Sequence, residues 1–104
     1  MTLDFKTKRV AFDTPLVGPR TESDAVFFGS NVKKANVAVK AFKLDFKQFA
    51  ERMNAVEVTA RGGVDAPTGG NEVSFSVTIQ YADQNANATF TGFVEVLVIA
   101  DVEP

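Results

Sequence analysis

The sequence predicts an all-β fold, an antiparallel β-sandwich of about six to eight short strands. Three observations support this prediction. Apolar and polar residues alternate over several segments, and turn-forming residues separate those segments at fairly regular spacing. The segment 93–102 is rich in β-branched residues and contains no glycine or proline. At 104 residues the chain is close to the commonest domain size, so residues 1–104 are expected to form a single domain.

The segment 93–102 is the predicted centre of a sheet. Side chains alternate between the two faces of a strand. One face is entirely apolar and consists of Val94, Val96, Val98, Ala100 and Val102. The other face is apolar only in its middle and consists of Phe93, Glu95, Leu97, Ile99 and Asp101. We therefore expect a strand that is buried on one side throughout and on the other side in part.

The first quarter of the chain predicts an extended arm, a loop and a short strand. Apolar residues alternate with polar ones over residues 3–12, which favours an extended conformation. Two prolines and a glycine disfavour regular structure over residues 14–23, which are predicted to form a loop. A short apolar strand over residues 24–28 follows, and it ends at Gly29.

The segment 32–46 alternates with a change of phase in its middle. Apolar residues fall on one phase as far as Ala41 and on the other phase from Phe42 to Phe46. A one-residue slip of this kind is typical of a β-bulge. The alternative is a helix, because apolar residues from Phe42 onward also recur at helical spacing. We favour a strand to Phe46, followed by one helical turn over residues 47–52.

The second half of the chain predicts three more strands. Residues 55–61 alternate, and the glycine-rich segment 62–71 is predicted to be a long loop. Residues 73–82 form the cleanest strand pattern, with one apolar and one polar face. A polar turn over residues 83–89 leads into the last strand, residues 90–102.

The composition excludes several function classes. Eleven Lys and Arg against thirteen Asp and Glu give a net charge of −2, which argues against a dedicated nucleic-acid binder. The chain has no cysteine and no histidine, so it has no disulfide, no Cys/His zinc site and no thiolate or imidazole for catalysis. An enzyme is not expected, because a serine or threonine nucleophile would have no histidine base.

The hydropathy pattern predicts no membrane insertion and no cleaved signal peptide. The longest unbroken aliphatic run extends from Val96 to Ala100, which is too short to span a bilayer. The N-terminal residues contain no apolar segment of secretory length. We therefore expect a protein that is cytoplasmic or is assembled into a particle.

Three segments resemble the H-type lectin-like family of small β-sandwiches. They are residues 9–17 (RVAFDTPLV), 32–44 (VKKANVAVKAFKL) and 96–100 (VLVIA). The resemblance implies a compact six-stranded fold, trimers or hexamers of identical chains, and sugar binding at subunit borders. Sugar sites in that family use a tryptophan and often a histidine near the last strands, and this chain has neither. Arg61 and Tyr81 are the residues that could take comparable roles.

The polar face of the strand 73–82 is a candidate ligand-binding surface. Its side chains are short hydroxyls and an amide, which can hydrogen-bond a sugar or another protein, and which are equally typical of an ordinary exposed strand face. The candidate ligand-binding residues are Arg61, Ser76, Thr78, Gln80 and Tyr81.

A candidate calcium loop begins at Asp83. Asp83, Asn85 and Asn87 place oxygen ligands at alternate positions, as at the start of an EF-hand loop. Ala88 stands where that loop requires glycine, and Val94 stands where it requires glutamate. An Asn-rich hairpin turn explains the same residues, since asparagine tolerates left-handed backbone geometry. Apart from this calcium, no cofactor is expected.

A row of lysines accompanies the predicted bulge. Such a row can meet phosphates or an acidic partner, or it can be a solvated face that protects an edge strand from aggregation. The lysines are Lys34, Lys40, Lys43 and Lys47, with Lys33 nearby.

The leading functional hypothesis is a non-catalytic, homo-oligomeric surface-recognition module, lectin-like in form, that binds a carbohydrate or another protein surface. Leu97 and Ile99 provide extra apolar area that would be buried between subunits. The alternative is a structural protein of a virion, phage or other assembly, such as a decoration or tail-associated subunit. Its support is the extended arm Met1–Arg9, which could pair with a neighbouring chain.

Overall fold

The computed structural model describes residues 1–17, 19–46, 53–64, 67–83 and 89–104. These residues form six strands and no helix, which confirms the all-β prediction. The strands are β1 (Thr2–Val17), β2 (Arg20–Phe27), β3 (Val32–Phe46), β4 (Met53–Gly62), β5 (Glu72–Asp83) and β6 (Thr89–Val102).

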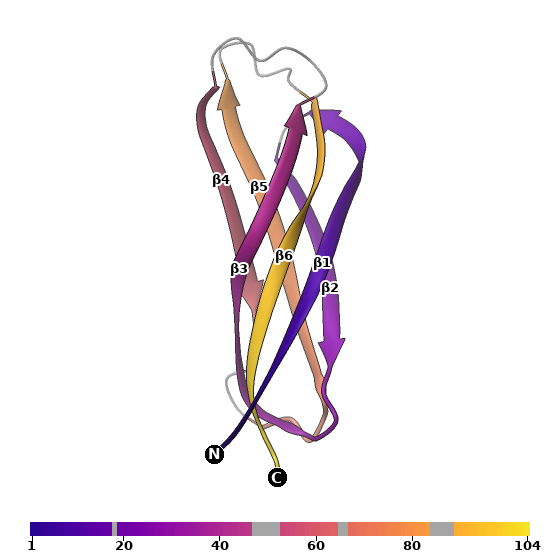
Figure 1. The fold of residues 1–104 in the computed structure, drawn as a ribbon, viewed down its shortest axis with the longest axis vertical. Helices are drawn as coiled ribbons and strands as arrows, with labels where there is room; N and C mark the ends of the chain where they lie inside the picture. The colour runs from indigo at the N-terminus through magenta and orange to yellow at the C-terminus, as the bar shows by residue number, and fades with distance from the viewer. Residues whose placement is uncertain (18, 47–52, 65–66, 84–88) are drawn as a thin grey trace.

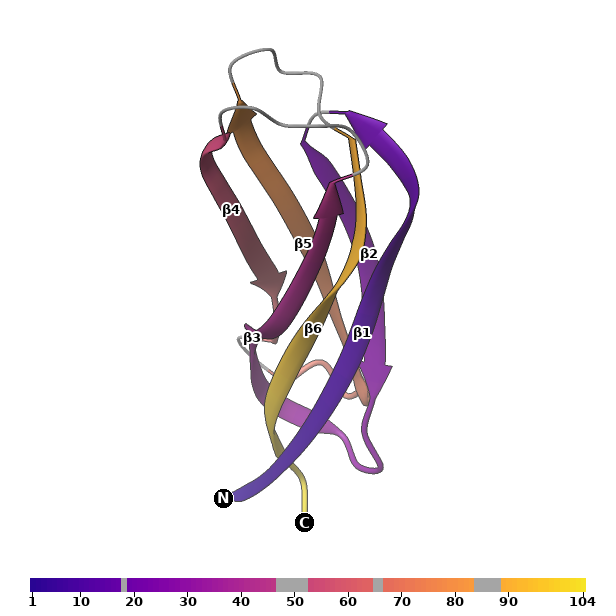
Figure 2. The ribbon, with the colours of Figure 1, turned by 45° about the horizontal axis from the view of Figure 1, so that its top comes forward.

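The strands form two three-stranded antiparallel sheets that pack face to face (Figure 1). One sheet has the order β1-β6-β3 and the other has the order β2-β5-β4. The strands run roughly along the long axis, so the sandwich is elongated, with extents of 52 × 20 × 17 Å. The two chain termini lie at the same end (Figures 1 and 2).

The strand β6 is central in its sheet, as its sequence predicts. Its apolar row faces the other sheet, and Val94, Val96 and Val98 are fully buried. Burial of one such side chain contributes about 1.5–3 kcal/mol. The opposite row, from Phe93 to Asp101, is half-buried throughout, which also agrees with the prediction.

The strand β5 is the central strand of the second sheet and supplies the other half of the core. Val73, Val77 and Ile79 are fully buried, and Phe75 is nearly so. Over residues 73–80, whose side chains the structure describes, the predicted alternation therefore correctly separates a core face from a polar face. Residues of both sheets belong to one continuous hydrophobic cluster.

The predicted bulge in β3 is confirmed. The register between β3 and β6 shifts between Val39 and Ala41, which makes Lys40 the extra residue. A second shift occurs between Val32 and Lys34. The helical turn predicted over residues 47–52 lies outside the described residues.

The loop predicted over residues 14–23 is wrong in its extent, because β1 continues to Val17 and β2 begins at Arg20. A proline is tolerated in an edge strand, and β1 is an edge strand of its sheet. The register of β1 with β6 also breaks between Phe12 and Leu16, so regular pairing is interrupted around Pro15. The residues from Thr2 to Phe12 pair with β6, so the arm predicted at the N-terminus is part of the sheet.

Arg20 closes one end of the core. Its guanidinium lies over the rings of Phe12 and Phe90, at 5.2 and 5.0 Å from their centroids. The Nη1 group of Arg20 donates a hydrogen bond to the Phe90 carbonyl oxygen at 3.1 Å. These contacts hold the first residue of β2 against the other sheet, which explains why a strand replaces the predicted loop.

Gly92 is required for the close approach of β6 to β3. A Cβ atom at this position would overlap the carbonyl oxygen of Lys43 and would lie 3.1 Å from the Cα atom of Leu44. The φ angle of Gly92 is +155°, which L side chains rarely adopt. Gly29 differs in both respects, since a Cβ atom there would meet nothing within 4 Å.

We expect Gly92→Ala to lower the free energy of unfolding by about 2 kcal/mol or more, because the two backbones must separate. The matched control Gly29→Ala should change it by less than about 0.5 kcal/mol. Urea denaturation followed by circular dichroism measures both values. Equal midpoints for the two variants would contradict this account of the β3–β6 contact.

Candidate functional site

The two outer faces of the sandwich differ in chemistry. Residues that stand opposite each other in antiparallel strands share a face of the sheet. The outer face of the β2-β5-β4 sheet, named the hydroxyl face below, consists of Thr21, Ser23, Ala25, Phe27, Glu57, Thr59, Arg61, Glu72, Ser74, Ser76, Thr78 and Gln80. On the outer face of the β1-β6-β3 sheet, four neighbouring side chains form an apolar patch: Leu3, Phe5, Leu97 and Ile99.

The hydroxyl face brings together four of the five predicted ligand-binding residues. Ser76 of β5 stands opposite Arg61 of β4, so these two candidates are direct neighbours. Thr78 follows on the same face, and Gln80 stands opposite Glu57. The fifth candidate, Tyr81, belongs to β5, and its side chain lies outside the described part of the chain.

Hydroxyl groups from three strands meet in the middle of this face. Thr78 lies between Thr21 of β2 and Thr59 of β4. The Oγ1 atoms of Thr21 and Thr78 are 2.9 Å apart and share a hydrogen bond. Ser76 likewise has Ser23 of β2 on its other side. The face therefore presents a lattice of short donors and acceptors rather than a single polar row.

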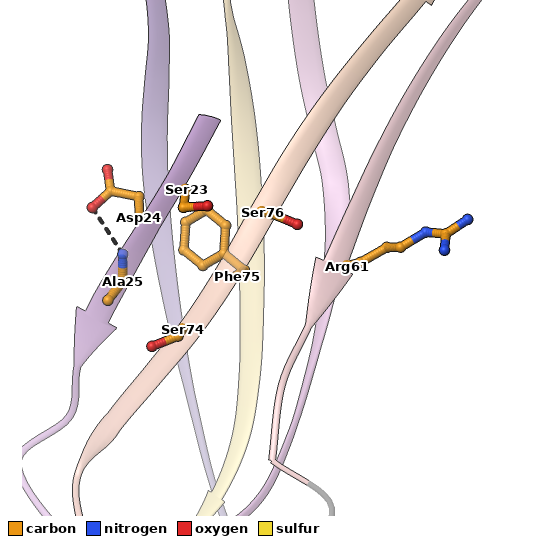
Figure 3. A pocket seen from close by; sticks show the side chains of 7 residues that line it. All are labelled: Ser23, Asp24, Ala25, Arg61, Ser74, Phe75 and Ser76. Carbon is orange, nitrogen blue, oxygen red and sulfur yellow. Dashed lines mark hydrogen bonds between the residues drawn. The ribbon is translucent and has the colours of Figure 1, made fainter. Parts of the chain in front are cut away.

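A broad, open depression occupies the end of this face near Arg61 (Figure 3). Its volume is about 600 Å³. In Figure 3 the Arg61 side chain extends away from β5, and the Asp24 carboxylate accepts a hydrogen bond from the Ala25 amide at 2.8 Å. The lining residues are Ser23, Asp24, Ala25, Arg61, Ser74, Phe75 and Ser76. An open, shallow surface of this kind suits a flat or extended ligand better than an enclosed small molecule.

The sequence-based candidates omit several residues of this face, among them Thr21, Ser23, Thr59 and Phe27. Thr21 and Ser23 fell in the predicted loop, and Thr59 was not connected to the β5 row. Phe27 stands at one end of the face, two positions beyond Ala25, and 59% of its surface is exposed. The alternation of β2 would have indicated the first two residues if the strand had been extended to Arg20.

The predicted calcium loop falls largely outside the described residues. Asp83 ends β5, where its backbone pairs with Met53, and its side chain is not described. Asn85 and Asn87 lie in the segment 84–88, which the structure does not describe. The described residues contain no group of three or more acidic side chains that could hold a metal ion. The calcium site stays a prediction.

The apolar patch contains both residues predicted for a subunit interface. Leu97 and Ile99 are half-buried on β6, and Phe5 of the neighbouring β1 stands opposite Ile99. Phe5 and Leu3 are 56% and 52% exposed. A groove of about 220 Å³ runs beside Leu3 and Ile99. The β1 strand thus enlarges the apolar surface that β6 alone predicted.

The lysines of β3 do not form one row. Lys34 and Lys43 stand opposite Asp101 and Phe93 on the outer face, whereas Lys33 and Lys40 are the extra residues at the two register shifts. Lys47 lies outside the described residues.

Arg9, Glu95 and Phe93 form a cluster beside the apolar patch. The Nη2 group of Arg9 donates a 2.6 Å hydrogen bond to Oε1 of Glu95, and its guanidinium lies 3.9 Å from the centroid of the Phe93 ring. The hydrogen bond from Arg9, reinforced by the charges of Arg9 and Lys40, lowers the pKa of Glu95 below its ordinary value of 4.5. The cluster links β1 to β6 at the surface.

The pKa of Glu95 gives a pH-dependent contribution to stability. Because this pKa is lower in the folded chain than in the unfolded chain, the contribution is present above about pH 4.5 and is lost as the pH falls through the folded value. We expect Glu95→Gln and Arg9→Gln each to flatten the decline of the free energy of unfolding below pH 4.5. Urea denaturation at a series of pH values measures the slope. An unchanged slope in both variants would contradict the assignment.

No protein-family model matches the chain, and neither the curated proteins nor the solved structures provide a match. Within the described residues, there is no helix with the length and hydropathy needed to cross a membrane. The resemblance to the H-type lectin-like family stays a prediction.

Proposed function

We propose that this protein is a non-catalytic, homo-oligomeric recognition module that binds glycans with its hydroxyl face and associates with copies of itself through its apolar patch. The observation that carries the proposal is the contrast between the two outer faces. One carries hydroxyl groups from three strands beside an amide and a guanidinium group, and the other carries the apolar patch of Leu3, Phe5, Leu97 and Ile99.

The hydroxyl face suits a saccharide for two reasons. Sugar hydroxyls both donate and accept hydrogen bonds, and so do the hydroxyls of Ser76 and Thr78. These short side chains lose little conformational freedom when a ligand orders them. Phe27 adds an exposed aromatic ring at the end of the face, on which the apolar side of a sugar ring can pack. Arg61 and Gln80 supply longer donors beside the hydroxyl groups.

The apolar patch suits a second copy of the chain. Contiguous exposed apolar surface on a soluble domain typically marks an interaction site. Oligomers of identical chains are usually closed and symmetric, so one such patch on each subunit is sufficient to assemble them. A trimer or hexamer is the proposed state, as the resemblance implies.

The first experiment is a glycan-array screen of the purified protein, in calcium and again in chelator. Binding to a defined class of saccharide supports the proposal, and loss of binding in chelator supports the calcium loop at Asp83. Absence of binding to the whole array would overturn glycan recognition. An oligomer that binds no glycan would favour the alternative, an assembly subunit of a virion or other particle.

We expect Ser76→Ala to weaken binding of the glycan found by the array about five-fold, the equivalent of about 1 kcal/mol for one lost hydrogen bond. Phe27→Ala should weaken it at least as much, because the aromatic contact is lost. Ser30→Ala, outside the hydroxyl face, is the matched control and should bind like the wild type. Isothermal titration calorimetry measures the three constants. Unchanged affinity in both variants would place the ligand elsewhere on the protein.

We expect Leu97→Asp and Phe5→Asp to remove the association that the apolar patch provides, and so to lower the mass of the oligomer, because each places a carboxylate in the apolar contact. Phe5 is exposed, so its replacement should leave the fold intact even if Leu97→Asp is insoluble. Phe27→Asp, on the opposite face, is the control and should keep the wild-type size. Multi-angle light scattering measures the masses. A monomeric wild-type protein would contradict the proposed self-association.

A further inference from the structure

Four of the six described strands lie at sheet edges, and edge strands commonly carry features that prevent pairing with another chain. The strands β1 and β2 carry charged residues at inward-facing positions. Lys6 and Lys8 of β1 stand opposite buried valines of β6. Glu22 and Asp24 of β2 stand opposite Val77 and Phe75. The Lys8 ammonium and the Asp24 carboxylate lie 3.9 Å apart, so these charges cover the flank between β1 and β2.

The strand β3 is protected in a second way. Both of its register shifts insert a lysine, Lys33 at one and Lys40 at the other. A bulge disrupts the regular hydrogen-bonding edge, and a lysine there makes burial of that edge costly.

Over residues 55–62, the strand β4 has neither an inward-facing charge nor a bulge that carries a lysine. Its single irregularity falls before Ala55, so the remaining strand is regular. Its inward-facing residues are Val56, Val58 and Ala60, and it contains no lysine or proline. The described part of the chain places no strand on the side of β4 away from β5 (Figure 2). This edge presents regular backbone N–H and C=O groups to a partner.

The sequence of β4 is complementary to itself. When two copies pair antiparallel with Thr59 opposite Thr59, Glu57 of each copy stands opposite Arg61 of the other. Both residues lie on the hydroxyl face, so two symmetric ion pairs form across the contact. We infer that β4 pairs with β4 of a second copy about a two-fold axis at Thr59, which joins the two β2-β5-β4 sheets into one continuous sheet.

Other symmetric registers are less favourable. Paired residues must share a face, so the axis passes through a residue of β4. An axis at Glu57 places two carboxylates opposite each other, and an axis at Arg61 does the same for two guanidinium groups. Axes at Val58 or Ala60 pair each charge with an uncharged residue. Only Thr59 matches opposite charges.

Exposed apolar residues lie on the same flank. Val56 of β4 and Phe42 of the neighbouring β3 are 40% and 53% exposed. The strands β3 and β4 form one side of the sandwich, and Ala35 of β3 forms a bridge with Val64, two residues beyond the end of β4. Pairing of β4 brings a second copy of this flank alongside the first, which removes apolar surface from water.

The contact extends the proposed glycan-binding surface without depending on it. The hydroxyl faces of the two copies become one surface, with the Thr59 residues at its centre. The guanidinium of Arg61 has more N–H donors than one carboxylate can accept, so Arg61 can hold Glu57 of the second copy and still reach a ligand.

The test is a charge exchange measured by sedimentation velocity over a range of protein concentrations. The Phe5→Asp background removes association through the apolar patch. Glu57→Arg and Arg61→Glu each place like charges opposite each other and should raise the dimer dissociation constant at least about ten-fold. The double variant Glu57→Arg/Arg61→Glu should return the dissociation constant to its value in the Phe5→Asp background. A monomeric Phe5→Asp protein, single variants that dimerise normally, or a double variant that fails to dimerise would each overturn the inference.

A cross-linking experiment locates the axis in the otherwise unmodified chain. The sequence contains no cysteine, so Thr59→Cys introduces a single thiol. Two such residues opposite each other have Cα atoms about 4.5–5.5 Å apart, within the range that a disulfide accepts. Mild oxidation should give a covalent dimer of Thr59→Cys much faster than of the control Ser23→Cys on the β2 edge. Equal rates would overturn the proposed register.

Discussion

The packing of β6 against β5 across the sandwich is the constraint on which the rest of this structure depends. Each is the middle strand of a three-stranded sheet, and each buries one row of the side chains that the structure describes, from Val94 to Val102 on β6 and from Val73 to Ile79 on β5. When alternate side chains of a strand are buried in the core, the side chains between them point outward and need not pack against the other sheet. The outer faces can therefore carry different chemistry without cost to the fold. One face holds hydroxyl groups and the other holds Leu97 and Ile99.

Alternation alone predicts much of this arrangement. It separates the buried Val94 row from the Leu97 row, and it indicates the bulge in β3 through a change of phase. Prediction from the local sequence fails where tertiary contacts override the preferences of individual residues. Pro15 and its neighbours predict a loop, yet the edge position of β1 tolerates a proline, and the contacts of Arg20 with two aromatic rings extend β2.

The sequence indicates some residues of the candidate site but not how they are arranged. Ser76 and Arg61 were both selected from the sequence, whereas their direct opposition follows from the register of β4 with β5. Thr21 reaches Thr78 only because β2 pairs with β5, a strand distant in the sequence. Strand order depends on contacts between remote segments, which no local pattern contains. For the same reason the sequence indicated Leu97 and Ile99 but not Phe5 beside them.

The two proposed contacts between copies have different geometries, and their combination limits the assembly. Pairing of β4 is isologous, because the same residues are used on both sides of a two-fold axis. The apolar patch lies on the other sheet and faces away from the hydroxyl face, so both contacts can form on one chain. If the patches close a ring of three subunits, a two-fold contact at β4 perpendicular to the ring axis joins two rings into a dihedral hexamer. In such a hexamer each hydroxyl face continues into that of a subunit in the other ring, and a glycan with several branches could then engage two subunits at once.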